Sequence, residues 1–206
     1  MRLFIISISF LLVKVLIAST PLNISVGYHA GYDSNVLRFS QMEIENASDN
    51  KEEMGSANTF DSYINKINTR LEKTIFQLNK KEISISSSFN LSNYVHNSNK
   101  DYWSGNIITT YKWGSYKNFK YIMRRLNSYY LRHYIDRDIS TNSLRPCYFS
   151  DQDQIASITM PIKNRMWYSF GLGYLQRYYD NPFTEFDLDI YYARFRLNKR
   201  IKKFGT

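Results

Sequence analysis

Apolar and polar residues alternate one by one along several stretches of this chain, and this period of two constrains the fold more than any other feature. In residues 22–30 (LNISVGYHA), apolar side chains occupy every second position. Such alternation is typical of a β-strand with one apolar and one polar face. The pattern recurs at 83–92, 103–113, 166–174 and 191–197, and more weakly at 119–136 and 154–160. Together with 63–76, these segments predict an all-β fold of about eight strands.

Two places fit this pattern less well. Ile64, Ile67 and Leu71 also have helical spacing, and Asp61 could cap a helix there. We predict a strand over Tyr63–Phe76 because every neighbouring segment is one, and a helix remains the alternative. Arg124-Arg125 puts an arginine on each face of its segment, which predicts a bulge or a position near a membrane interface.

The connections between these segments differ at the two ends. Residues 79–82, 114–118, 161–165 and 199–203 are short and basic, whereas 33–60, 93–101, 137–150 and 180–186 are polar and mostly longer. Short turns at one end and long loops at the other are typical of outer-membrane barrels with a periplasmic amino terminus. We therefore predict an antiparallel up-and-down transmembrane β-barrel.

Such a barrel turns apolar side chains to lipid and small or polar ones inward. The chain has 18 tyrosines, 13 phenylalanines and 3 tryptophans, and aromatic residues gather at membrane interfaces. We expect an aromatic girdle of Tyr28, Trp103, Tyr111, Trp113, Tyr168, Tyr174 and Tyr191. We expect the lumen to contain Arg70, Arg194 and Arg196. Lumen charges set ion selectivity in wide barrels and form ion pairs in narrow ones.

The amino terminus predicts export. Residues 1–19 have a basic start, an apolar run and small residues at the end, as in a secretory signal peptide. This leaves 20–206 as the barrel domain. Removing Arg2 and Lys14 lowers the formal net charge from +9 to +7, and export argues against nucleic acid as the partner of this basic chain.

Gly31-Tyr32-Asp33-Ser34-Asn35-Val36 follows the first alternating segment, and Tyr-Tyr-Asp-Asn-Pro at 178–182 has a similar position. Both resemble strand-to-loop junctions of uncharacterised bacterial outer-membrane β-barrel proteins. The resemblance implies a location in a Gram-negative outer membrane, with membrane lipids, lipopolysaccharide and the barrel assembly machinery as partners. Barrels of this kind usually end on an aromatic residue, whereas Thr206 follows a basic turn. We expect a larger barrel continuing beyond it, with atypical eight-stranded closure as the alternative.

Little in the sequence points to chemistry. His29, His96 and His133 lack metal-site spacing, and the single cysteine excludes an internal disulfide. Asp151 and Asp153 share a strand face, which we interpret as an outer rim that is solvated or holds divalent ions beside lipopolysaccharide phosphates. We predict a non-enzymatic barrel without metal or cofactor, serving as a porin-like pore for small solutes or as a surface and structural barrel. The alternatives are a secreted soluble β-barrel or sandwich that binds a ligand, and an outer-membrane hydrolase using His133 near Asp136 and Asp138.

Overall fold

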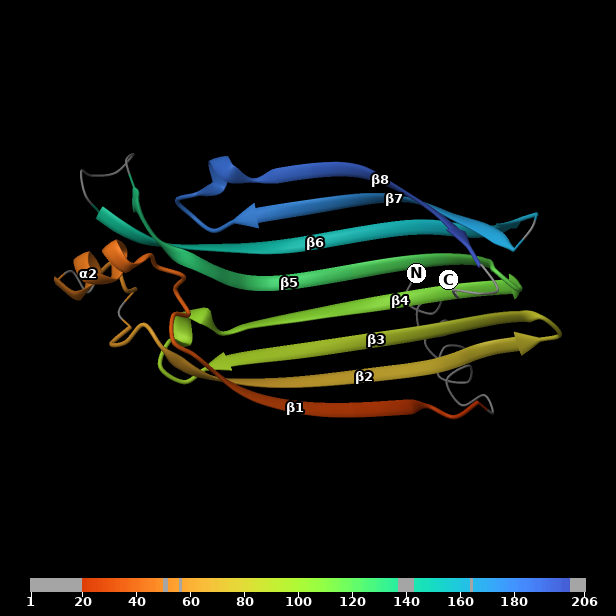
Figure 1. The fold of residues 1–206 in the computed structure, drawn as a ribbon, viewed down its shortest axis with the longest axis horizontal. Helices are drawn as coiled ribbons and strands as arrows, with labels where there is room; N and C mark the ends of the chain where they lie inside the picture. The colour runs from red at the N-terminus through yellow and green to blue at the C-terminus, as the bar shows by residue number, and fades with distance from the viewer. Residues whose placement is uncertain (1–19, 50–51, 56, 137–142, 164, 201–206) are drawn as a thin grey trace, which may run out of the picture.

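The computed structural model describes residues 20–49, 52–55, 57–136, 143–163 and 165–200, and the proposed signal peptide lies outside them. Eight strands follow one another in space as they do in sequence, each antiparallel to the next (Figure 1). They are β1 (Asn23–Asp33), β2 (Ser62–Leu78), β3 (Lys81–Tyr94), β4 (Tyr102–Gly114), β5 (Lys117–Asp136), β6 (Ser143–Ile162), β7 (Met166–Tyr179) and β8 (Leu188–Lys199). The prediction of an all-β, up-and-down fold is confirmed, and Tyr63–Phe76 is strand rather than helix.

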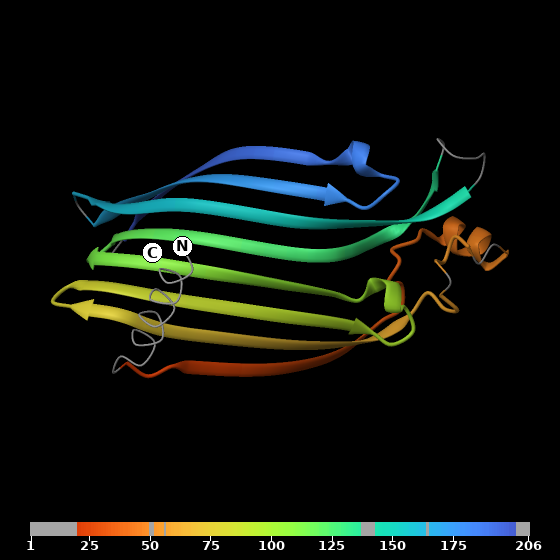
Figure 2. The ribbon, with the colours of Figure 1, turned by 180° about the vertical axis from the view of Figure 1, so that it is seen from behind.

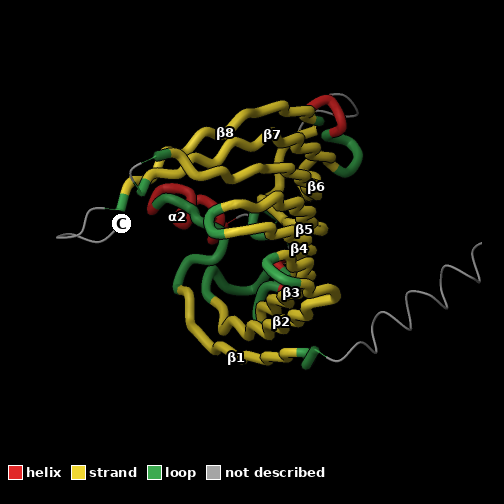
Figure 3. The backbone as a smooth tube through the Cα atoms, turned by 90° about the vertical axis from the view of Figure 1, so that its right-hand side faces the viewer, coloured by secondary structure: helices red, strands yellow, loops and turns green. Residues whose placement is uncertain are grey.

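The sheet is curved but open. Seen along the strands, it forms a C whose two ends are β1 and β8 (Figure 3). Within the described residues, the backbone pairings join only consecutive strands, and none joins β1 to β8. Figure 2 shows the same sheet from behind. No helix in the described part of the chain is long and apolar enough to cross a membrane.

Strand register gives the sheet one apolar and one polar face. On the apolar face, one row of cross-strand partners runs over four strands through Tyr28, Ile67, Leu91 and Trp103. On the opposite face, Arg70, Ser88, Asn106 and Arg124 form an equivalent row.

Burial of the two faces is the reverse of that in a soluble sheet. In β3, Phe89 and Leu91 are exposed, whereas Ser88, Asn90 and Ser92, which alternate with them, are half-buried or buried. Side chains converge on the hollow side of a curved sheet, so the polar face is the hollow one. We call it the hollow face below.

β5 is bent near its carboxyl end by two irregularities in its pairing with β6. They lie between Leu126 and Tyr129 and between Tyr130 and His133. No bulge lies at Arg124-Arg125, because both residues pair regularly with β6, and the alternative of a position near a membrane interface stays a prediction. The extra residue is accommodated after them, where Ser128 takes a positive φ of 52° and its N–H bonds to the Ser150 hydroxyl at 3.0 Å.

The connection between β1 and β2 contains helix α2 (Gln41–Asp49), which lies at one end of the sheet on its open side (Figures 1 and 3). Val36, Leu37 and Phe39 from this connection pack with Tyr130 of β5, which is only 1% exposed. Most of the buried apolar residues in the described chain thus belong to this loop end, rather than to the body of the sheet.

Two shorter helices, η1 (Ser98–Lys100) and η2 (Thr184–Phe186), occupy other connections at that end. β6 begins at Ser143, so residues 143–150 are strand and not loop as expected. Cys147 accordingly lies buried in a strand.

Candidate functional site: the hollow face of the sheet

A ladder of small polar side chains covers the hollow face over β3 and β4. The Asn106 amide donates to the Ser88 hydroxyl at 2.6 Å, and the Asn90 amide donates to the Ser104 hydroxyl at 3.4 Å. These side chains are short, so they project little from the sheet. A recess of about 350 Å³ lies beside them, and Arg124, Asp151 and Asp153 contribute to its wall.

A tyrosine crosses one strand to join the far side of this recess. The Tyr192 hydroxyl on β8 donates to Asp153 on β6 at 2.5 Å, passing over β7. It can do so because its partner in β7 is Gly173: a Cβ there would lie 2.2 Å from the Tyr192 ring. Asp153 also accepts from Arg124 at 3.3 Å.

The second carboxylate of the recess is held by an arginine on the neighbouring strand. Arg177 donates through Nε and Nη2 to the two oxygens of Asp151, at 2.7 and 2.9 Å. Its guanidinium also lies 4.0 Å from the centre of the Phe149 ring. Two-point pairing of this kind fixes both side chains. Asp151 and Asp153 are therefore paired with arginines and do not form the solvated rim we expected.

The hollow face carries more cations than anions. Up to the bend of β5, its described strand positions hold eight basic and five acidic residues, and the five carboxylates are all in ion pairs. Four basic residues have no ion pair with any described residue: Lys66, Lys120, Arg194 and Arg196. Register places Arg194 and Lys120 in one row, separated only by Gly171 and Ser157.

The three arginines predicted for the lumen all lie on the hollow face, and their contacts differ. Arg70 pairs with Glu72 at 3.2 Å on the same strand. Arg194 lies 4.8 Å from the centre of the Tyr192 ring. Arg196 is exposed near the edge of the sheet. The structure thus puts two of them on the edge strand β8 and one on β2.

The predicted girdle residues all lie on the apolar face, and all but Tyr28 have an aromatic ring beside them. One group lies toward the long connections (Trp103, Tyr174 and Tyr191) and the other toward the short turns (Tyr111, Trp113 and Tyr168), while Tyr28 lies at the centre of β1. Trp103 stacks on Phe89, Tyr174 on Tyr191 and Tyr168 on Phe195. The hydroxyls of Tyr28 and Tyr174 donate to Asn65 and Asp189 at 2.7 Å.

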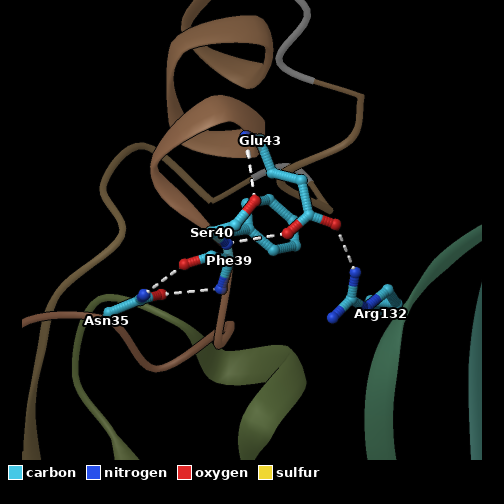
Figure 4. A network of polar contacts seen from close by, with 5 residues as sticks. All are labelled: Asn35, Phe39, Ser40, Glu43 and Arg132. Carbon is cyan, nitrogen blue, oxygen red and sulfur yellow. Dashed lines mark hydrogen bonds and ion pairs between the residues drawn. The ribbon is translucent and has the colours of Figure 1, made fainter.

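The loop that covers one end of the hollow face is held by a capping box (Figure 4). The Ser40 N–H donates to the Glu43 carboxylate at 2.7 Å, and the Glu43 N–H donates to the Ser40 hydroxyl at 3.3 Å. These bonds hold the pKa of Glu43 below its usual value. The same carboxylate accepts from Arg132 of β5 at 2.8 Å, and Asn35 bonds to both N–H and C=O of Phe39.

A buried lysine holds the bend of β5. Lys100 Nζ donates to the carbonyls of Tyr130 and Leu131 at 3.1 and 3.0 Å, at the second irregularity of this strand. Burial, and then Arg132 nearby, lowers the pKa of Lys100 to about 8. Sequence reasoning missed this lysine. It also missed α2, although Ser40-x-x-Glu43 is a capping-box signature.

No family of known proteins, curated protein or solved structure matches this chain.

His133, the histidine of the alternative hydrolase, packs against Tyr130, and Asp138 lies outside the described residues. His133 Nδ1 lies 2.6 Å from the Tyr130 hydroxyl, and a side chain on Gly55 would collide with both residues. Among the described residues, no group of three His, Cys, Asp or Glu side chains is placed to hold a metal ion.

Proposed function

We propose that this chain forms the wall of a bacterial outer-membrane β-barrel without enzymatic activity, which passes or holds small hydrophilic solutes. The apolar face of the sheet contacts lipid, and the hollow face lines the interior. Outer-membrane lipids and lipopolysaccharide surround the wall, and the barrel assembly machinery inserts it.

The observation that carries this proposal is the reversed burial of the two faces. In the interior strand β7, Phe170 and Leu172 on the apolar face are 40% and 58% exposed, whereas the hollow-face residues that alternate with them are half-buried or buried. Large exposed apolar patches mark surfaces that meet another apolar phase. A sheet with this face in water would be an aggregation hazard, whereas lipid satisfies it and leaves the polar face for water.

The position of the aromatic residues supports the same placement. Tyrosine and tryptophan prefer the interface, where the ring is apolar and the polar tip reaches water. Except for Tyr28 at the centre of β1, the predicted girdle residues lie toward one end or the other of their strands, as expected for the two interfaces of a bilayer. Ten residues of strand suffice to cross, since about 9–11 are needed, and all eight strands are long enough.

A matched pair of substitutions tests the lipid-facing side. Leu172 is 58% exposed in the middle of β7 on the apolar face. Leu172→Arg in a membrane wall destabilises the fold by about 2–4 kcal/mol. In a soluble domain, a charge at this exposed position changes stability by less than about 0.5 kcal/mol.

Ser86→Arg is the control, because Ser86 lies on the hollow face directly opposite Glu72. It leaves stability nearly unchanged if that face meets water. The measurement is urea unfolding of the protein in lipid vesicles, together with heat-modifiable gel mobility of the membrane fraction. A protein found entirely in the soluble periplasm, with Leu172→Arg neutral, would favour the secreted ligand-binding domain instead.

A further inference from the structure

The two edge strands of the sheet lack a partner strand within the described residues. β1 and β8 each leave one row of backbone N–H and C=O groups pointing away from the sheet. In a hydrocarbon layer, every unpaired backbone group costs several kcal/mol, so a membrane sheet must pair both edges. This requirement rests on the membrane location proposed above.

Closing β8 on β1 of the same chain would give eight strands, and the charges of the hollow face argue against it. An eight-stranded barrel has an interior just wide enough for side chains. In the open sheet, Lys66, Lys120, Arg194 and Arg196 make no ion pair with a described carboxylate, and each carboxylate of the hollow face up to the bend of β5 already pairs with another cation. Burying an ion without a partner costs several kcal/mol. In a barrel of about sixteen strands, a water channel keeps these cations hydrated.

We propose that two copies of this chain close one sixteen-stranded barrel, with β8 of each copy pairing with β1 of the other. An even number of up-and-down strands makes β1 and β8 run in opposite directions. A second copy, related by a twofold axis along the barrel, therefore adds antiparallel neighbours at both edges. The same rotation keeps apolar faces outward and hollow faces inward.

The two edges also fit one another in length and side-chain size. β1 has 11 residues and β8 has 12. On the hollow face, β8 presents the long side chains of Tyr192, Arg194 and Arg196, and β1 presents Ser25 and Gly31 on either side of His29, while Asn68 of β2 already covers Gly27. Within one chain, Tyr192 already lies over a glycine of β7 in this way.

Cross-linking of the two edges tests this assembly in the full chain refolded into detergent micelles or lipid. Ser25→Cys on β1 is combined in turn with Arg194→Cys, Arg196→Cys and Asn198→Cys on β8, so that several registers are covered. A bis-maleimide reaching diagonal cross-strand neighbours, about 7–8 Å apart, then joins whichever pair is adjacent. The native Cys147 is buried, and the unsubstituted chain controls for it.

We expect at least one double variant to give a covalent species of twice the mass of one chain. Ser25→Cys alone gives none, because the two β1 strands lie on opposite sides of the barrel. Differently tagged chains carrying only Ser25→Cys or only Asn198→Cys (or the best β8 position) form a cross-linked heterodimer when refolded together.

A bridge formed within one monomer overturns the proposal in favour of eight-stranded closure. The absence of any bridge in a heat-modifiable membrane protein also overturns it, because other strands then occupy the edges. Neither result contradicts the proposed outer-membrane function. Failure to enter membranes at all contradicts that function as well, so the two failures are distinguishable.

Discussion

The ring of Tyr192 occupies the space where a side chain on Gly173 would lie. A glycine at this position lets the Tyr192 side chain reach across β7, so that the Asp153 carboxylate accepts hydrogen bonds from both Tyr192 and Arg124. Neither residue alone would signal this contact in the sequence, because tyrosine and glycine at alternating positions are ordinary in strands. The contact depends on which residues the register brings together.

Gly173→Ala is predicted to destabilise the sheet by about 1–3 kcal/mol, since the added methyl group must displace the Tyr192 ring. Urea unfolding of the refolded protein measures the change. Gly31→Ala is the matched control: the nearest atom to its added Cβ is a His29 ring nitrogen at 3.6 Å, an ordinary contact. Equal effects at the two glycines would show that the ring does not require Gly173.

Lys100→Met is predicted to destabilise the loop end by about 1–3 kcal/mol, because two carbonyls of β5 lose their donor. Hydrogen exchange of the Val36 N–H, bonded to the Phe60 carbonyl at 2.9 Å, reports opening of this end. Faster exchange of this amide in the variant is expected. Unchanged exchange would mean that the bend of β5 does not depend on Lys100.

The pKa of Lys100 adds a pH dependence to the same comparison. Folding lowers this pKa from 10.5 to about 8, so the charged form opposes folding. That destabilisation is complete below pH 8 and disappears as the pH rises toward 10.5. The free energy of unfolding of the native chain, measured relative to that of Lys100→Met, should therefore increase between pH 8 and 10.5. A decrease in this difference over the same range would contradict the burial of Lys100.

Strands whose sequences alternate regularly between apolar and polar residues could be predicted. Elements that depend on contacts with distant parts of the chain could not. Each of the eight predicted segments is a strand, because period-two patterning reflects the environment of both faces. β6 is longer than predicted, since residues 143–150 pair with the bent end of β5. α2 belongs to a loop whose apolar residues pack against Tyr130, a contact between distant parts of the chain that local patterning does not reveal.

The attachment of α2 can be separated into its capping and ion-pair parts. Glu43→Gln keeps an acceptor for the Ser40 N–H but removes the charge that pairs with Arg132. Exposed ion pairs contribute about 0–1 kcal/mol, whereas loss of a cap costs about 0.5–2 kcal/mol. We expect Glu43→Ala to speed hydrogen exchange of the Ile44 N–H clearly more than Glu43→Gln. Equal effects would assign the attachment to Arg132 instead.

The shape of the whole sheet lies beyond what alternation can determine. Strand patterning specifies faces, and turns specify order, but closure depends on how far the edges curve and on what they meet. The predicted lumen arginines and girdle aromatics fall on opposite faces of the sheet. Their presence in a lumen and at membrane interfaces remains a prediction that rests on the proposed location.

The surplus of cations on the hollow face predicts anion preference if this face lines a water-filled pore. In planar bilayers under a KCl gradient, the reversal potential should indicate chloride passing more readily than potassium. Replacing Lys120, Arg194 and Arg196 by glutamine should move that potential toward zero, and more strongly at 0.1 M than at 1 M salt, where the Debye length falls from about 10 Å to about 3 Å. Arg125→Gln removes a positive charge from the apolar face instead and should leave selectivity unchanged. Cation preference, or an equal effect of Arg125→Gln, would show that ions do not pass along the hollow face.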